Sequence, residues 1–132
     1  MALITWTKEQ YGTDVSVCDG EHKILFDKLN KLYDLATGGA ARSAIGAQLD
    51  DLISYVAEHF ATEERLMQEK KYAGYTAHKA EHDTLVATCL DLQKKFHNGE
   101  AEITAETGAF VKGWLDSHIP KFDMPYAPSL NS

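Results

Sequence analysis

The sequence HFATEERLMQEKKYAGYTAHKAEH at residues 59–82 decides the fold. It holds two polar pairs, His59/Glu63 and His78/His82, and the two members of each pair are four residues apart. Side chains at that spacing lie on the same face of an α-helix. The stretch KKYAGYT between the pairs reads as a short loop that joins the end of one helix to the start of the next. The segment therefore predicts two antiparallel helices whose polar pairs meet beside the connecting loop.

Apolar residues continue at helical spacing on both sides of this segment. They predict four helices, at about 19–38, 43–70, 76–97 and 105–123. We expect an irregular N-terminal arm over 1–18, while Pro125 and Pro128 indicate an irregular tail over 124–132. Four amphipathic helices with short loops favour an all-α fold, an up-down-up-down antiparallel four-helix bundle, as a single domain over 1–132.

Polar residues interrupt the apolar stripe of each predicted helix at positions where a core residue is expected. An unpaired buried carboxylate costs several kcal/mol, whereas a whole domain has a net stability of only about 5–15 kcal/mol. Such residues are tolerable inside a core only if they satisfy one another, and a bound metal achieves this economically. The residues are His22, His59, Glu63, His78, His82, His118 and Asp123.

These seven residues fall at one level of the predicted bundle. They occupy the start of the first helix, the end of the second, the start of the third and the end of the fourth. In an antiparallel bundle those four regions share one end. A lone histidine in an apolar stripe is more often an ordinary core residue, but the joint convergence of seven ligand-type side chains predicts a metal site.

The ligand set constrains the metal only in part. Imidazoles and carboxylates suit iron, zinc, manganese or copper, so spacing alone leaves the metal open. Five imidazoles and two carboxylates are too many for one ion, but two ions can share both carboxylates and a bridging oxide or hydroxide. An ion with three imidazoles then has six ligands, and an ion with two imidazoles has five. The second ion keeps one position open for a small molecule.

The end of the fourth helix requires an unusual backbone. His118 and Asp123 are five residues apart, which places them about 140° from one face in a regular α-helix. Pro120 lies between them and deletes a backbone hydrogen bond. A local bulge or unwinding would aim both side chains inward. We therefore predict irregular helix geometry over 118–123.

Four segments, CDGEHKILFDKLNKLYD, HFATEE, HKAEH and HIPKFDMPY, resemble the hemerythrins, specifically the bacterial single-domain hemerythrins. The ligand pattern H…HxxxE…HxxxH…HxxxxD is complete, and the resemblance covers essentially the whole chain. It implies reversible binding of molecular oxygen at two non-haem iron ions joined by an oxo or hydroxo bridge. By this resemblance one iron is held by His78, His82 and His118, the other by His22 and His59, and both by Glu63 and Asp123.

The resemblance also implies an apolar oxygen pocket near the iron that His22 and His59 would hold. Its expected residues, for each of which ordinary core packing is the alternative, are Leu25, Phe60, Trp114, Leu115 and Ile119. Glu21 replaces the glutamine that is usual before the first histidine, and we expect it to be solvated, with an indirect influence on the metal ligands as the alternative. Glu64 is also expected to face solvent.

The leading functional hypothesis is an oxygen-binding protein, not an enzyme, for storage, transport or delivery to an oxygen-consuming enzyme. The alternatives are a di-iron redox enzyme, such as a peroxidase, nitric-oxide reductase or ferroxidase, and an oxygen sensor. A formal charge of −7 without basic clusters argues against nucleic-acid binding. The sequence has no apolar run long enough to span a membrane and no signal-peptide pattern, and its two cysteines are far apart. We therefore expect a cytoplasmic monomer.

Overall fold

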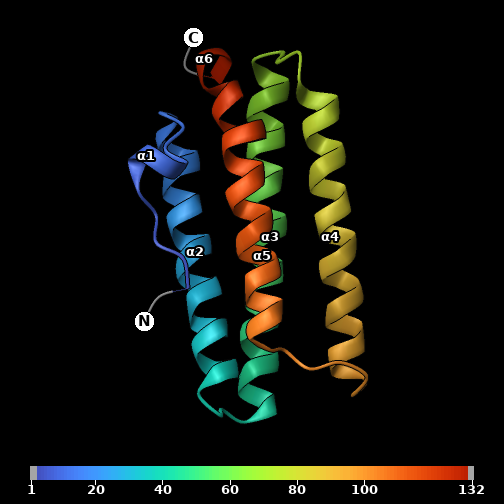
Figure 1. The fold of residues 1–132 in the computed structure, drawn as a ribbon. Helices are drawn as coiled ribbons and strands as arrows, with labels where there is room; N and C mark the ends of the chain where they lie inside the picture. The colour runs from blue at the N-terminus through green and yellow to red at the C-terminus, as the bar shows by residue number, and fades with distance from the viewer. Residues whose placement is uncertain (1–2, 131–132) are drawn as a thin grey trace.

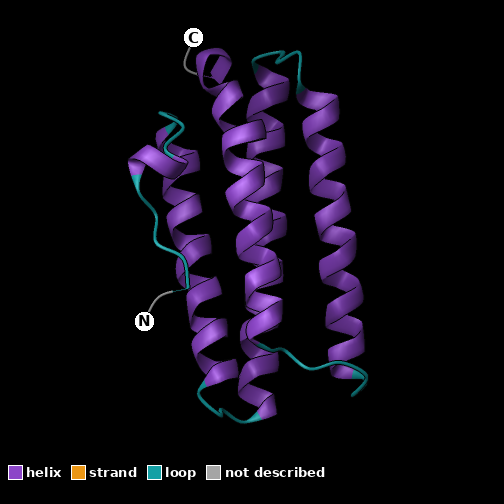
Figure 2. Cartoon of the chain, viewed as in Figure 1, coloured by secondary structure: helices purple, strands orange, loops and turns teal. Residues whose placement is uncertain are grey.

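The computed structural model describes residues 3–130, and every regular element in that range is a helix (Figure 2). The bundle consists of α2 (Ser16–Thr37), α3 (Arg42–Glu69), α4 (Tyr75–His97) and α5 (Ala105–His118). Shorter elements flank it: α1 (Lys8–Tyr11), a π-helix (Ile119–Asp123), a 3₁₀-helix (Met124–Tyr126) and α6 (Ala127–Leu130). The predicted all-α helical bundle is confirmed.

The four long helices run side by side and alternate in direction (Figure 1). The start of α2, the end of α3, the start of α4 and the end of α5 consequently lie at the same end of the bundle. We call this the ligand end, and it carries the 70–74 connection. The opposite end carries the 38–41 and 98–104 connections, and we call it the far end.

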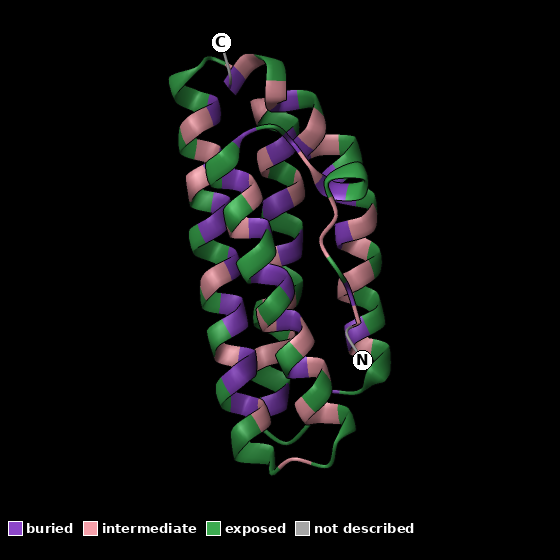
Figure 3. Cartoon of the chain, turned by 90° about the vertical axis from the view of Figure 1, so that its left-hand side faces the viewer, coloured by how far each residue is buried: buried purple, intermediate pink, exposed green. Residues whose placement is uncertain are grey.

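Burial follows the helical period, so each long helix turns one stripe of buried residues inward (Figure 3). Burying one large aliphatic side chain stabilises a fold by roughly 1.5–3 kcal/mol, and the far end is filled by Leu29, Leu32, Leu49, Leu52, Val56, Leu85 and Phe96. A second, smaller cluster packs at the ligand end and consists of Val15, Cys18, Met67, Tyr126 and Leu130.

The N-terminal arm is more ordered than the irregular segment predicted over 1–18, of which residues 1–2 lie outside the described range. α1 forms within it, and α2 begins at Ser16 instead of residue 19. The Ile4 N–H donates to Asn30 Oδ1 (2.9 Å), and Asn30 Nδ2 donates to the Ile4 carbonyl (2.7 Å). Asp19 lies in the first turn of α2, and its carboxylate accepts from the N–H and the hydroxyl of Thr13 (2.9 and 2.7 Å).

The C-terminal segment also differs from the irregular tail predicted over 124–132, of which residues 131–132 lie outside the described range. A 3₁₀-helix and α6 form there because both prolines fall in a first helical turn, where a missing N–H costs little. This places Tyr126, which is fully buried, against the ligand end.

Candidate metal centre

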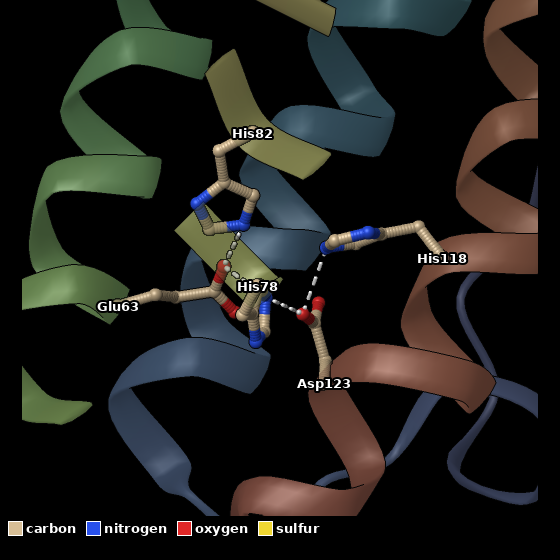
Figure 4. A group of neighbouring side chains, drawn as sticks. All are labelled: Glu63, His78, His82, His118 and Asp123. Carbon is tan, nitrogen blue, oxygen red and sulfur yellow. Dashed lines mark ion pairs between the residues drawn. The ribbon is translucent and has the colours of Figure 1, made fainter. Parts of the chain in front are cut away.

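Seven side chains of ligand type meet inside the ligand end. Each has at most 2% of its surface exposed. They come from all four long helices and the π-helix: His22 from α2, His59 and Glu63 from α3, His78 and His82 from α4, His118 from α5, and Asp123 from the π-helix. Figure 4 shows five of them pointing toward one another. The structure therefore brings together every residue that the sequence placed in the predicted cluster.

The larger group of ligand atoms contains three imidazoles and two carboxylates. His78 Nε2 and His118 Nε2 lie 2.8 and 3.0 Å from Asp123 Oδ1. His82 Nε2 lies 3.2 Å from Glu63 Oε1 (Figure 4). All five residues offer ligand atoms within 4.8 Å of one another, which is compact enough for one ion.

The smaller group contains two imidazoles and the same two carboxylates. His22 Nε2 lies 3.0 Å from Asp123 Oδ2, and His59 Nε2 lies 3.4 Å from Glu63 Oε1. Its ligand atoms also lie within 4.8 Å of one another. Because Glu63 and Asp123 belong to both groups, the arrangement has the form of a dinuclear site with two shared carboxylates.

These close approaches are not aligned as hydrogen bonds. Among the buried atoms without a hydrogen-bond partner are the Nε2 atoms of His59, His78, His82 and His118 and both carboxylate oxygens of Asp123. Buried polar atoms are nearly always satisfied, so such a concentration requires a missing partner. Two ligand atoms about 2.1 Å from one ion and at right angles are roughly 3 Å apart, as several of these pairs are. The residues present therefore fit a metal centre.

The π-helix places Asp123 in the cluster. The Met124 N–H donates to the carbonyl of Ile119, five residues earlier, so one turn there contains an extra residue. Pro120 is the second residue of this π-helix and cannot donate a backbone hydrogen bond. The wider turn brings Asp123 Oδ1 to His118 Nε2 across five residues. The predicted irregular geometry over 118–123 is confirmed.

The two shared carboxylates are ionised in spite of their burial. Burial raises the pKa of Asp123, but the imidazoles of His118, His22 and His78 outweigh this and hold it well below its usual range. Burial and Asp123 raise the pKa of Glu63, but neighbouring imidazoles again lower it overall. Burial lowers the pKa of His22, whereas these carboxylates raise it to about 10. The site thus concentrates two negative charges where a cation would bind.

Tyr126 binds one oxygen of the shared carboxylate of Glu63. Its hydroxyl donates a hydrogen bond of 2.6 Å to Glu63 Oε2. Burial and the nearby Glu63 and Asp123 carboxylates raise the pKa of Tyr126, so the hydroxyl keeps its proton. Nothing in the sequence spacing links this tyrosine to Glu63, so the contact could not be predicted from the sequence.

Two carboxylates outside the cluster were assigned wrongly to solvent. Glu21 Oε1 lies 2.8 Å from His59 Nδ1, and Glu21 Oε2 accepts a hydrogen bond from Thr62 Oγ1 (3.3 Å). Glu64 Oε2 lies 3.0 Å from His82 Nδ1. A carboxylate on the outer nitrogen fixes the orientation of an imidazole and makes it a better ligand. Each ligand group therefore has one histidine that is oriented by a glutamate.

The five predicted pocket residues lie in the core around the cluster. Leu25, Phe60, Leu115 and Ile119 have at most 4% of their surface exposed, and Trp114 is half-buried. Phe60 stacks on His82 with 3.7 Å between ring centroids, and Trp114 stacks on His118 at 4.1 Å. Both aromatic residues thus stack on imidazoles of the larger group, whereas the resemblance implies a pocket beside the smaller group; the Phe60 ring also lies 5.9 Å from the ring of His59 in the smaller group.

Within residues 3–130, none of the helices combines the length and apolar character that a membrane crossing requires.

Comparison with known proteins points to one family. The Hemerythrin HHE cation binding domain family matches residues 13–130. A bacteriohemerythrin of Methylococcus capsulatus is 56% identical over the whole of both chains. A bacteriohemerythrin of Stenotrophomonas maltophilia is 31% identical over all of this chain and 84% of its own length. A crystal structure of wild-type hemerythrin has a TM-score of 0.97 and 56% identity, and covers 99% of this chain and 100% of that one.

Proposed function

The chain belongs to the hemerythrin family, and on this premise we propose that it binds molecular oxygen reversibly at a non-haem di-iron centre. The observation that carries the proposal is the unequal pair of ligand groups around two shared carboxylates. One group has three imidazoles and the other has two, so the second offers one protein ligand fewer. Two ferrous ions with an oxo or hydroxo group between them would supply the electrons that reversible oxygen binding needs.

In this proposal each ligand has one assignment. His78, His82 and His118 would hold the first ion, and His22 and His59 would hold the second. Glu63 and Asp123 would be ligands of both ions. The support is the division of the ligand atoms into two compact groups that have only these carboxylates in common.

The surrounding residues orient the ligands. Glu21 and Glu64 accept from the outer nitrogens of His59 and His82, respectively. The Nε2 atoms of the two histidines therefore face the centre. Tyr126 donates to one oxygen of Glu63 and so restrains the bridging carboxylate. Because Tyr126 keeps its proton, its hydroxyl acts as the hydrogen-bond donor to Glu63. It does not compete with the carboxylates for the metal as a phenolate anion would.

The apolar residues exclude water from the small-molecule position. Leu25, Phe60, Leu115 and Ile119 are almost fully buried and belong to one hydrophobic cluster with Trp114 at its edge. An aliphatic wall offers water no hydrogen-bond partner. A dry pocket slows the access of protons and water, and this favours release of oxygen over irreversible oxidation of the centre.

We further propose a cytoplasmic role in oxygen storage or in delivery to an oxygen-consuming enzyme. The support comes from Cys18 and Cys89, which are both free thiols. Unpaired cysteines suit a reducing compartment. Neither residue is placed among the metal ligands.

An anaerobic titration tests the proposal. Protein loaded with ferrous iron should contain two ions per chain, be nearly colourless, gain a visible absorption band in air and lose it under vacuum through repeated cycles. His97→Ala is the matched control, because His97 lies outside both ligand groups and the variant should keep the band. His22→Ala should lose it. Oxidation that vacuum does not reverse would contradict reversible binding.

One observation favours a redox enzyme as the second candidate. Tyr126, whose hydroxyl bonds to Glu63, belongs to the same buried cluster as Cys18, so two oxidisable side chains lie near the metal ligands. If air produces ferric protein that turns over added peroxide, and Tyr126→Phe slows that turnover, the enzyme candidate replaces oxygen binding. An oxygen sensor would instead show the reversible band together with a change in conformation.

A further inference from the structure

A cavity of about 30 Å³ lies inside the bundle on the far-end side of the ligand cluster, between α2, α3, α4 and α5. A single water-sized molecule needs roughly 10–15 Å³ of such space, so the cavity has room for one small molecule. Most of its wall is aliphatic, and its buried lining residues include Leu29, Leu49, Leu52, Ile53, Val56 and Leu85.

The chemistry of this wall selects the occupant. A buried water needs two to four polar partners, and cavities lined by leucine, isoleucine and valine stay dry. The polar lining residues, among them Thr104 and Thr107, stand only where the cavity approaches the start of α5. A small apolar gas loses no hydrogen bond on leaving water and gains dispersion contacts with the wall.

The cavity lies next to the apolar pocket of the proposed oxygen site. On three helices its lining residues stand four positions from pocket residues: Leu29 from Leu25, Val56 from Phe60, and Val111 from Leu115. Four residues advance an α-helix by about 6 Å. One layer of side chains therefore separates the cavity from the ligand cluster.

The cavity also lies close to the surface. A groove between α4 and α5 shares five residues with the cavity wall: Cys89, Leu92, Thr104, Thr107 and Val111. None of the five is buried, so a single layer of side chains separates the cavity from solvent as well. The cavity thus lies between the groove and the ligand cluster.

We propose that this cavity binds one molecule of a small apolar gas, dioxygen in particular, and lies on its route from the α4–α5 groove to the ligand cluster. Binding of the gas requires only the aliphatic wall. The role in the route rests on the proposed function.

Xenon tests the site independently of iron. Crystals of the iron-loaded protein pressurised with xenon should show one atom among Leu29, Leu52 and Val56. Leu52→Phe adds a ring to the wall from a residue that is 4% exposed and cannot turn outward, so it should abolish xenon binding. Leu90→Phe is the matched control, because Leu90 is 50% exposed and lies outside the cavity; it should leave xenon binding unchanged. An empty cavity in the wild-type protein, or undiminished xenon in Leu52→Phe, would overturn the site.

Oxygen kinetics test the route. A blocked route slows entrance and exit alike, so Leu52→Phe should lower the association and dissociation rates of oxygen severalfold and in the same proportion, with unchanged affinity. Leu90→Phe should change neither rate. Xenon binding with unaltered oxygen rates in Leu52→Phe would overturn the route and leave the gas site. If Leu52→Phe does not fold, Leu85→Phe fills the same cavity from α4, at a residue that is 3% exposed, and is judged by the same outcomes.

Discussion

The far end of the bundle and the ligand end fill their interiors with opposite kinds of side chain. At the far end, leucine, valine and isoleucine from all four long helices pack together and leave one small apolar cavity. At the ligand end, five imidazoles and two carboxylates occupy the same inward-facing stripe, and many of their atoms have no hydrogen-bond partner. Burial of apolar surface stabilises the first region unaided. We infer that the second depends on bound metal for its stability.

Removing a shared ligand should have the largest effect. Glu63→Ala takes a ligand from both groups and leaves the Tyr126 hydroxyl without its acceptor. We expect iron content to fall at both positions and the free energy of unfolding to drop by about 3–5 kcal/mol. Metal analysis and denaturant titration measure the two quantities. Full iron content in this variant would contradict the assignment of Glu63 as a shared ligand.

A cavity in the far end should cost stability but not iron. Leu29→Ala removes a side chain that is 1% exposed, and we expect a loss of about 2–4 kcal/mol in the free energy of unfolding. The iron content should remain at the wild-type level, because no ligand or ligand partner is touched. If the iron content fell together with the free energy of unfolding, the two ends would not be independent of each other.

The outer glutamates should tune metal affinity without much effect on the bundle. Glu64→Ala and Glu21→Ala each remove the partner of one ligand imidazole, and such changes typically lower metal affinity about 10–100-fold. Competition with a chelator measures the affinity. The glutamine variants should recover part of the loss, since an amide oxygen still accepts from the ring nitrogen. Glu58→Ala, on the exposed surface of α3, is the control. An equal loss of metal affinity in this variant would contradict a specific role of Glu21 and Glu64.

A polar contact on the outside of the far end should contribute least to the stability of the fold. Asp50 Oδ1 lies 2.8 Å from both His97 Nε2 and Gln93 Nε2. The hydrogen bond from His97, aided by Gln93, lowers the pKa of Asp50. The contact therefore stabilises the fold above the unfolded pKa of roughly 4 and loses this contribution as pH falls through the lower, folded value.

Because both partners are largely exposed, Asp50→Asn should cost only a few tenths of a kcal/mol at pH 7. Denaturant titrations of the two proteins should show this difference from pH 7 down to about 4.5 and its disappearance only in stronger acid. A difference that vanished near neutral pH would assign the effect to a group other than Asp50.

The bundle and the cluster could be predicted because polar residues inside an apolar stripe are costly unless they converge. His59 and Glu63 could be aligned with His78 and His82 from helical spacing alone, since antiparallel order fixes their level. The irregular turn at 118–123 could be predicted from the spacing of two residues. His118 and Asp123 must both face inward, yet side chains five residues apart do not lie on one face of an α-helix. In each case a periodic rule of the backbone decided the outcome.

The outer glutamates could not be found by that rule. Glu64 stands about 100° around the helix from Glu63, which indicates solvent. Its flexible side chain nevertheless reaches the outer nitrogen of His82. Glu21 likewise reaches across from α2 to His59 on α3. The available signal was chemical, because a ligand histidine usually donates its second N–H to a carboxylate or carbonyl.

The arm and the cavity escaped prediction for a different reason. The start of α2 depends on a tertiary contact in which Asp19 accepts two hydrogen bonds from Thr13. In the sequence alone, an aspartate at this position looks like a helix cap. The cavity depends on how the volumes of many side chains fail to fill the space between four helices. Neither feature has a periodic signature.

The single extra residue in the turn at 119–123 shifts the phase of everything that follows it. Asp123 rotates under His118, and Tyr126, three residues further on, rotates with it to meet Glu63. One backbone irregularity therefore sets two contacts of the cluster at once. A change that restored regular α-helical hydrogen bonding here without altering the chain length would rotate both side chains away from the cluster together, because Asp123 would then stand about 140° from His118. The hydrogen bonding of this turn is consequently under stricter constraint than the identity of its exposed residues.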